Sequence, residues 1–317
     1  MRKLIRIGTR ESQLAVWQAT LVQDLLSKNN YQSQLVYIKS EGDIDLKTPL
    51  YDMGVQGIFT RSLDIALLND QIDIAVHSMK DVPTQLARGI AQAAVLERAS
   101  HKDIFVYKDE GPVSGWKLGE PSEAVCLQLP GLIATSSIRR KAQWLNRYPD
   151  HVIENLRGNV NTRLRKVAES NWNGAIFAAA GLERINLRPE KAIDLDWMLP
   201  APAQGAIMVV CREEDEFSKE ACQYFNHMET ALCTKVERDF LRALLGGCST
   251  PISALAVVKA DEIYFRGNII SVDGKEKVTI EKTCSLVEAT EFGRTAAEEI
   301  LQNGGDKIAE AIRNGAK

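Results

Sequence analysis

Hydrophobic residues recur along the first hundred positions in two alternating patterns. Short apolar runs bounded by Gly, Asp or Asn are typical of buried strands, and apolar residues three or four positions apart are typical of helices. The expected strands lie at residues 4–7, 35–38 and 72–76, and the expected helices at 12–26 and 61–69. Strands that alternate with helices in this way predict a mainly parallel, doubly wound α/β sheet.

A second set of the same kind follows a polar stretch at 108–121 that contains Pro and Gly. The expected strands lie at 131–135, 152–153 and 175–178, and the expected helices at 138–147 and 162–170. An apolar run at 206–211 follows the Pro-containing segment 200–205 and is expected to return to the first sheet. The pattern therefore predicts two α/β domains, of which the first is discontinuous.

The pattern changes from about residue 224 and predicts a smaller α+β domain. The expected elements are a helix at 229–245, strands at 252–258 and 262–270, a hairpin turn with an Asp-Gly centre at 272–275, and helices after 290 and 306. The expected domains are 1–98 with 203–223, then 99–202, and finally 224–317.

Composition narrows the class of protein. Of the 317 residues, 45% are hydrophobic and 26% are charged, which is ordinary for a soluble globular chain. No apolar run has the length of a signal-peptide core or a membrane span, so we expect a cytoplasmic protein without membrane contact. The six cysteines include no C-x-x-C pair and no zinc-ligand spacing, which predicts free thiols and no metal site.

Positive charge is concentrated in one segment, although the formal net charge is −3. Residues 134–166 contain eight Lys or Arg and two acidic residues. Taken as a charge run alone, this excess indicates a solvated helix face. The nearby Trp144 and Tyr148 raise a nucleic-acid alternative, which the overall acidity opposes.

The positions of these cations favour an anion site. Segment 134–140 (ATSSIRR) ends an expected strand and opens an expected helix, so hydroxyls, backbone N–H groups and two guanidinium groups meet at a helix N-terminus. Segments 8–12 and 156–163 repeat the arrangement, and the ends of strands in an open α/β sheet converge on one crevice. Neither a P-loop nor a G-x-G-x-x-G fingerprint is present, so a polycarboxylate ligand fits at least as well as a phosphate.

The loop 77–83 (HSMKDVP) follows the third expected strand. Lys80 and Asp81 could form only a surface ion pair, which contributes little. If they face the crevice, Asp81 could stabilise a developing cation and handle protons while Lys80 holds an anionic substituent. His77, beside an apolar strand, is expected to be a hydrogen-bonded structural residue rather than a base.

Cys248 follows a helix that Gly246 and Gly247 are expected to end. The carboxyl end of a helix is its negative pole, which raises the pKa of a nearby thiol and argues against an activated nucleophile. Taken alone, an inert thiol is the simpler interpretation of this residue.

Together these segments resemble the porphobilinogen deaminases, also called hydroxymethylbilane synthases. The most specific motifs are HSMKDVP (77–83), TSSIRR (135–140), RGNVNTRL (157–164) and GGCSTP (246–251). Further matching runs are RIGTRESQLAVWQA (6–19), GIFTRSLDIALL (57–68), AAAGLERI (178–185) and QGAI (204–207). The resemblance therefore extends along the whole chain in a consistent order.

The resemblance implies a two-lobed fold, like type II periplasmic binding proteins, with a smaller C-terminal domain. It implies an enzyme that condenses four porphobilinogen molecules with release of ammonia and hydrolyses the product to hydroxymethylbilane. It also implies a dipyrromethane cofactor that is bound through a thioether to Cys248. A monomer with no nucleic-acid partner is expected.

The same resemblance implies roles for individual residues. Asp81 would contact pyrrole N–H groups and stabilise the cation formed when ammonia leaves, and Phe59 would pack near the opening of the site. The other expected cofactor- and substrate-binding residues are Arg10, Ser12, Lys80, Thr135, Ser136, Ser137, Arg139, Arg140, Arg157, Asn159, Arg163, Arg184 and Gln204.

The chain departs from the family pattern at three places. Gln56 stands where a lysine is common, Pro202 and Ala203 stand where Val-Gly is usual, and the segment 109–128 is longer than typical. None of these departures affects Asp81 or Cys248, so an active enzyme is expected. The alternative is a carboxylate-binding sensor or transport protein of the same architecture, which would need neither residue.

Overall fold

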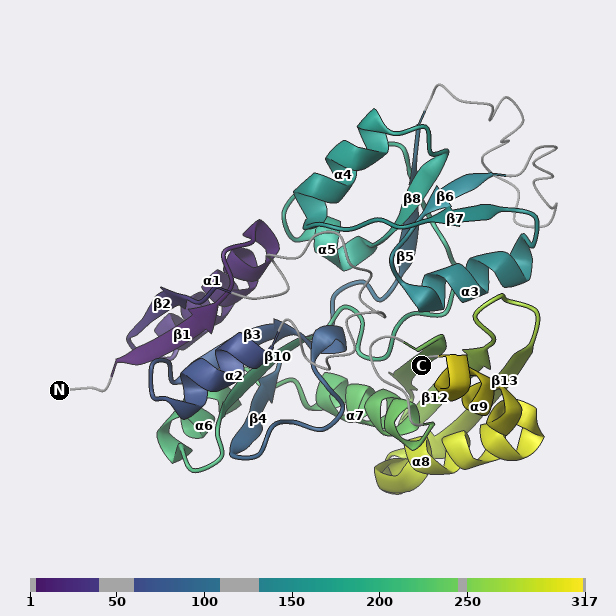
Figure 1. The fold of residues 1–317 in the computed structure, drawn as a ribbon. Helices are drawn as coiled ribbons and strands as arrows, with labels where there is room; N and C mark the ends of the chain where they lie inside the picture. Colours follow the sequence, from purple (N-terminus) through teal and green to yellow (C-terminus); the bar gives the residue numbers. More distant parts are fainter. Residues whose placement is uncertain (1–3, 40–59, 109–130, 245–249, 316–317) are drawn as a thin grey trace.

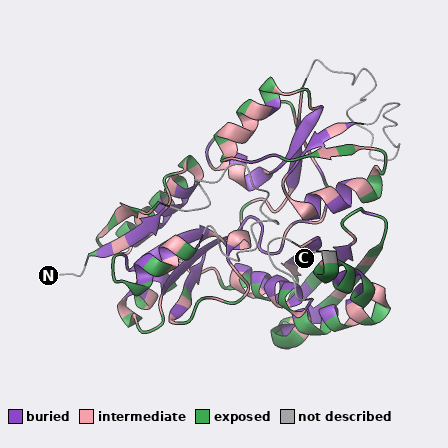
Figure 2. Ribbon diagram, in the orientation of Figure 1, coloured by how far each residue is buried: buried purple, intermediate pink, exposed green. Residues whose placement is uncertain are grey.

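The structure, a computed structural model, describes residues 4–39, 60–108, 131–244 and 250–315. Three sheets organise these residues, two of them in mixed α/β lobes and one in a C-terminal α+β unit (Figure 1). Buried residues concentrate on the strands and on the helix faces that pack against them (Figure 2). Among the described residues, no helix combines the length and the apolar character that crossing a bilayer requires.

The first sheet has the strand order β2-β1-β3-β10-β4. Its strands are β1 (Ile5–Thr9), β2 (Ser33–Tyr37), β3 (Ile74–Ser78), β4 (Ile90–Val95) and β10 (Ile207–Arg212). Strand β10 joins this sheet as expected, but it runs antiparallel to both of its neighbours. The expectation of a parallel sheet therefore holds only for β2, β1 and β3, because β10 enters from the other lobe and from the opposite end.

Helices cover both faces of this sheet. Helix α1 (Gln13–Lys28) and helix α6 (Glu216–Gln223) pack on one face, around Ile5, Ile7 and Val209. Helix α2 (Arg61–Leu68) packs on the other face. The alternation of buried side chains along β3 and β10 between the two clusters gives the doubly wound arrangement that the apolar pattern predicts.

The second sheet repeats this topology in the order β7-β6-β8-β5-β9. Its strands are β5 (Asp103–Tyr107), β6 (Leu132–Ala134), β7 (Val152–Glu154), β8 (Gly174–Ala178) and β9 (Ala192–Asp194). Strand β5, which follows directly from the first lobe, is antiparallel to β8 and β9. Helix α3 (Ile138–Arg147) packs on one face, and α4 (Val160–Glu169) and α5 (Ala179–Glu183) pack on the other. In each sheet, the antiparallel strand next to one edge strand is thus the one that comes from the opposite lobe.

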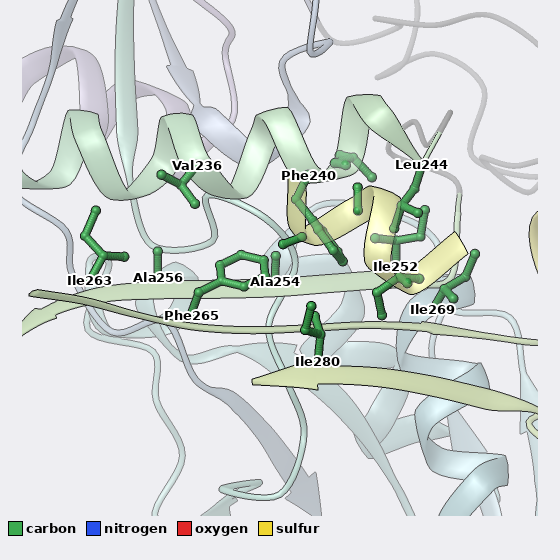
Figure 3. Close-up of a cluster of buried hydrophobic side chains, with 14 of the residues drawn as sticks. Val236, Phe240, Leu244, Ile252, Ala254, Ala256, Ile263, Phe265, Ile269 and Ile280 are labelled. Atoms are coloured by element: carbon green, nitrogen blue, oxygen red, sulfur yellow. The ribbon is translucent and has the colours of Figure 1, made fainter. Parts of the chain in front are cut away.

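The C-terminal unit is a three-stranded antiparallel sheet covered on one face by helices (Figure 3). Its elements are α7 (Met228–Ala243), β11 (Ile252–Lys259), β12 (Glu262–Ile270), β13 (Lys277–Ser285), α8 (Ala289–Ile300) and α9 (Asp306–Gly315). Phe240 and Phe265 meet edge to face in this core, with ring centroids 5.1 Å apart. The expected Asp-Gly turn lies between β12 and β13, where Gly274 has a φ of +79°.

Two crossing segments, at about 96–103 and 195–206, connect the lobes. They touch at Gly205, where a side chain would lie 2.7 Å from the carbonyl oxygens of Ala99 and Ser100. Ala203 has a φ of +63° at a position where the family pattern has glycine. A left-handed conformation is unfavourable for alanine, so this departure introduces strain into the crossing.

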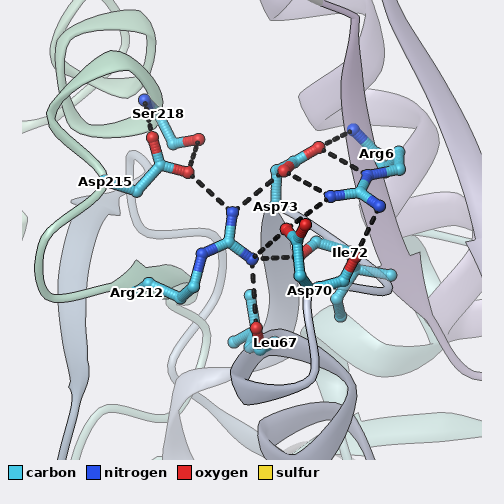
Figure 4. Close-up of polar contacts among 8 residues, drawn as sticks. All are labelled: Arg6, Leu67, Asp70, Ile72, Asp73, Arg212, Asp215 and Ser218. Carbon is cyan, nitrogen blue, oxygen red and sulfur yellow. Dashed lines mark hydrogen bonds and ion pairs between the residues drawn. The ribbon is translucent and has the colours of Figure 1, made fainter.

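Two buried carboxylates hold the elements together. Asp73 binds the guanidinium groups of Arg6 and Arg212, which joins β1, β3 and β10 (Figure 4). Glu237 on α7 binds Arg98 of the first crossing segment and accepts hydrogen bonds from the backbone N–H groups of Ala203 and Ala256. The second carboxylate thus connects α7, both crossing segments and the C-terminal sheet.

Candidate active site

The three expected strand-to-helix loops all lead into capped helices. The side chain of Ser12 accepts a hydrogen bond from the N–H of Ala15 at the start of α1, and Ser137 caps α3 in the same way. Asn159 caps α4 through a bond of 2.9 Å from the N–H of Thr162. These side chains satisfy helix donors, so the three predicted helix N-termini are confirmed.

Thr135 and Ser136 connect the loops to each other. The hydroxyl oxygen of Thr135 accepts a hydrogen bond of 3.2 Å from the N–H of Ser137. The hydroxyl of Ser136 donates to the carbonyl oxygen of Leu156, which lies just before Arg157 in the other loop. The loops after β6 and β7 therefore form one unit.

Asp103 is the centre of a buried ionic cluster that the sequence patterns do not reveal. Its carboxylate is fully buried and lies 2.8 Å from a guanidinium nitrogen of both Arg139 and Arg140. The two arginines lower the pKa of Asp103 to about 2 against the opposing effect of burial. A single Asp at the start of an apolar strand was the one available signal, and it does not identify the partners.

The two arginines of this cluster also bind backbone oxygens. Arg140 donates to the carbonyl oxygen of Ile176 at 3.0 Å and Arg139 to that of Leu199 at 2.7 Å. Both were expected to bind ligand carboxylates, and much of their donor capacity is used inside the protein. Their role therefore includes holding the second lobe against its crossing segment.

Lys80 reaches this cluster from the first lobe. Its ammonium lies 3.4 Å from the side-chain oxygen of Gln204, and the amide nitrogen of Gln204 donates to Asp103 at 2.9 Å. Burial lowers the pKa of Lys80 to about 8, although Asp81 acts in the opposite direction. The structure thus brings Lys80, Gln204 and the Asp103 cluster together at the junction of the lobes.

Arg157 and Arg163 add two more cations from the loop after β7 and the start of α4. Arg157 is only 4% exposed. Arg163 donates through Nε to the carbonyl oxygen of Gly158 at 2.8 Å, and no carboxylate contacts its terminal nitrogen atoms among the described residues. Burial and the charges of Arg140 and Arg157 together lower its pKa to about 10, against the opposing effect of Asp81. A partly buried guanidinium among other cations favours an added anion.

Asp81 ends a short 3-10 turn after β3 (Met79–Asp81) and faces the cations of both lobes. It lines a cavity of about 10 Å³ together with Arg10 and His77. His77 is buried, but its Nε2 atom has no hydrogen-bond partner among the described residues. Burial and then Arg10 lower the pKa of His77 to about 3, so the imidazole is neutral and unsuited to accept a proton.

Arg184 lies apart from this group. Its guanidinium packs over the ring of Trp17 at 5.7 Å and donates to the carbonyl oxygen of Gly205 at 2.7 Å. Burial lowers its pKa to about 10. Because Trp17 belongs to α1 and Arg184 follows α5, this contact joins the two lobes.

Two expected site residues, Cys248 and Phe59, lie outside the described residues, as does Gln56. The described cations and carboxylates that the structure brings together are Lys80, Asp81, Asp103, Arg139, Arg140, Arg157 and Arg163, which we call the cationic cluster. No group of His, Cys, Asp and Glu side chains with the arrangement of a metal site occurs in the described part of the chain.

Comparison with known proteins decides the family. The family model described as "Porphobilinogen deaminase, dipyromethane cofactor binding domain" matches residues 5–220, and the one described as "Porphobilinogen deaminase, C-terminal domain" matches residues 231–302. The chain belongs to the porphobilinogen deaminase family. The resemblance inferred from the sequence motifs is confirmed, and with it the dipyrromethane cofactor of the family.

Curated relatives match over almost the whole length. The porphobilinogen deaminase of Chlorobium phaeobacteroides strain BS1 is 38% identical, with 99% of each chain covered. That of Syntrophomonas wolfei is 39% identical, with 97% of this chain and 98% of the relative covered. Among solved structures, the methionine-binding protein MetQ matches 72% of this chain and 92% of its own at 14% identity, with a TM-score of 0.43.

Proposed function

We propose that this chain condenses four porphobilinogen molecules head to tail, releases ammonia at each step and hydrolyses the product to hydroxymethylbilane. The observation that carries the proposal is the cationic cluster, which places buried guanidinium groups from one lobe beside Lys80 and Asp81 from the other. Each pyrrole of the substrate bears acetate and propionate groups. A growing chain of such rings is a polyanion, for which several fixed cations are the matching partner.

The residues present fit the cofactor. A dipyrromethane carries carboxylates, and Arg163 is a partly buried cation with no carboxylate partner among the described residues. We place its attachment at Cys248 through a thioether, because this cysteine stands in the GGCSTP motif. When bound, the cofactor supplies the primer ring to which the first substrate unit is joined.

The chain's own residues have two different roles in this proposal, carboxylate binding and stabilisation of positive charge. Arg157, Arg163 and Lys80 bind pyrrole carboxylates, while Asp103 keeps Arg139 and Arg140 fixed in the same region. Asp81 stabilises the positive charge that develops as ammonia leaves, since a carboxylate lowers the energy of a nearby cation.

The other expected ligand-binding residues keep supporting roles in this proposal. Ser12, Ser137 and Asn159 fix the helix N-termini, Thr135 and Ser136 connect two loops, and Gln204 links Lys80 to Asp103. Arg10 lies beside Asp81 in the small cavity, and Arg184 joins the lobes. Phe59 is proposed to pack near the opening of the site.

We also propose the domain division 1–98 with 203–223, 99–202 and 224–317. The assignment of β10 to the first sheet and of β5 to β9 to the second supports this division. A cytoplasmic monomer without nucleic-acid partners is the state we infer for a biosynthetic enzyme of this composition.

The deciding experiment measures intact mass and turnover on the same samples. Purified from a host that makes porphobilinogen, the wild-type chain should exceed its sequence mass by one dipyrromethane, and Cys248→Ser should not. Asp81→Asn should keep the added mass but lose turnover by about a hundredfold or more, because it removes the charge that stabilises the cation. A wild-type chain with the bare sequence mass, or an Asp81→Asn variant with full activity, would contradict the proposal.

A further inference from the structure

A second cavity, of about 340 Å³, lies between the crossing segments and the C-terminal sheet. His101 and Lys102 line it from the first crossing segment, residues 195–200 from the second, and β11, β12 and β13 from the sheet. None of its lining residues belongs to the cationic cluster. The volume is within the usual range for small-molecule sites, and such sites often lie where domains meet.

One lining residue, Asn268 on β12, has a buried side-chain oxygen that no described residue binds. It is 3% exposed, and its Oδ1 atom has no hydrogen-bond partner among the described residues. Its neighbours across the sheet are Ser253 and Thr279, and the hydroxyl of Ser253 accepts a hydrogen bond from Gln143 instead. Buried amide groups in proteins nearly always have a partner, so the side chain is suited to a hydrogen-bonding ligand.

The wall of the cavity around Asn268 includes apolar side chains among its polar ones. Leu195, Met198, Leu255 and Ile280 line it and are each buried. Trp197 adds an aromatic ring, which is held in place by the guanidinium of Arg147 at 5.0 Å. A flat, mostly apolar ring is the ligand group that such a wall favours.

Three positive and two negative side chains line the cavity. Arg266 and Lys277 both line the cavity, and neither forms an ion pair among the described residues. Glu281 lies opposite Arg266 in the strand register, without such a contact. The third positive side chain, Lys102, is neutralised by Asp196 at 2.7 Å and by Asp194 at 2.9 Å. A carboxylate at the rim would therefore meet Arg266 and Lys277.

We propose that this cavity binds a small aromatic carboxylate that also carries a hydrogen-bond donor. The ring packs against Trp197 and Leu255, the donor reaches Asn268, and the carboxylate meets Arg266. Inorganic phosphate lacks the ring and the apolar contacts, so it should bind far more weakly. The proposal concerns a site separate from the cationic cluster and does not depend on the proposed function.

The test uses 4-hydroxyphenylacetate as the probe on the full-length holoenzyme. Titration is followed by NMR at the indole N–H signal of Trp197, which Trp197→Phe assigns. We expect saturable binding with a dissociation constant of about 1 mM or below, given the size of the probe. Two matched probes separate the contacts: phenylacetate lacks the donor, and p-cresol lacks the charge.

Matched variants then locate the probe. Asn268→Ala should weaken 4-hydroxyphenylacetate by about tenfold and leave phenylacetate unchanged, because only the donor contact is lost. Arg266→Gln should weaken both carboxylates by several-fold but not p-cresol. Arg163→Gln, in the cationic cluster, should change nothing.

Three results would overturn the proposal. The first is that no probe shifts the Trp197 signal saturably. The second is that Asn268→Ala weakens all probes equally. The third is that Arg163→Gln weakens binding whereas Arg266→Gln does not. The last result would place the carboxylate in the cationic cluster. Because the Oδ1 atom of Asn268 has no hydrogen-bond partner among the described residues, we expect Asn268→Ala to remain folded, and its melting temperature checks this.

Discussion

Lys80 is the residue whose charge state links the site to pH. Burial lowers its pKa to about 8, so it is charged below that pH and becomes neutral above it. If its charge holds a substrate carboxylate, kcat/KM should fall as pH rises above about 8, approaching tenfold per pH unit.

The matched variants are Lys80→Arg and Lys141→Arg. Arginine keeps its charge at alkaline pH, so Lys80→Arg should move the alkaline limb of the kcat/KM profile upward. Lys141→Arg, on helix α3, should keep the wild-type profile. An alkaline limb that is identical in all three proteins would show that another group causes it.

For single residues, the sequence predicted which residue types lie in the site better than it predicted which side chains they contact. Lys80, Asp81 and the arginines of the TSSIRR and RGNVNTRL motifs lie together, because each motif follows the end of a strand, whereas Arg184 lies apart. Asp103 was missed because its partners, Arg139 and Arg140, lie in a different element more than thirty residues away. Which guanidinium groups are used inside the protein depends on this tertiary contact, which no local pattern encodes.

Among the elements, β1, β3 and β10 are joined through Asp73. We expect protein stability to depend more on Asp73 than on the neighbouring Asp70. Asp73 is 1% exposed and binds Arg6 and Arg212, so Asp73→Asn should lower the free energy of unfolding by about 3 kcal/mol. Asp70→Asn is the control, because Asp70 contacts the same two arginines from an exposed position and should matter by about 0.5 kcal/mol or less. Urea unfolding measures both values.

The pH dependence of this effect has a definite sign. The two arginines hold the pKa of Asp73 well below its usual value of 3.8, so the folded state favours the carboxylate. Its contribution is present above that value and is lost as pH falls toward the lower pKa of the folded state. The stability gap between wild type and Asp73→Asn should therefore shrink below about pH 4. A gap that stays constant down to pH 3 would contradict this account.

Helices were easier to predict than short strands. Helix α3 begins and ends at the expected residues, since Ser137 is a cap and the helical periodicity is clear up to Arg147. Strands β4, β5 and β9 were missed because they adjoin the crossing segments, where no alternation or turn signal sets them apart. Strand β3 begins two residues later than expected because Ile72 packs beneath α2, as part of that helix's cluster, and the Asp73 side chain binds Arg6.

For the whole molecule, Glu237 is the contact on which the arrangement of the C-terminal unit depends. It is fully buried, binds Arg98 at 2.6 Å, and accepts from the N–H groups of Ala203 and Ala256. Glu237→Gln leaves the charge of Arg98 without its partner and should lower the free energy of unfolding by about 3–5 kcal/mol.

Glu229→Gln is the control for this variant. It lies on the same helix but is exposed, so its effect should stay within about 0.5 kcal/mol. Urea unfolding compares the two variants. Equal stabilities would show that Glu237 adds nothing beyond its packing.

The sequence patterns predicted the number of sheets, but they could not predict the order of the strands within the two lobes. Apolar periodicity identifies strands, but parallel and antiparallel neighbours have the same period. The antiparallel directions of β10 and β5 follow from the two crossing segments, which are tertiary features.

The interleaving of the lobes bears on how the chain is made. Strand β10 lies between β3 and β4, yet it is synthesised more than one hundred residues after β4. At the usual rate of translation, the edges of β3 and β4 that pair with β10 therefore remain unpaired for roughly ten seconds. During that interval the second lobe can already form, except for the crossing segment at 195–206 that returns to the first lobe. An unpaired strand edge can pair with other chains and cause aggregation. We therefore expect chaperones to be most important while the first lobe is incomplete during synthesis.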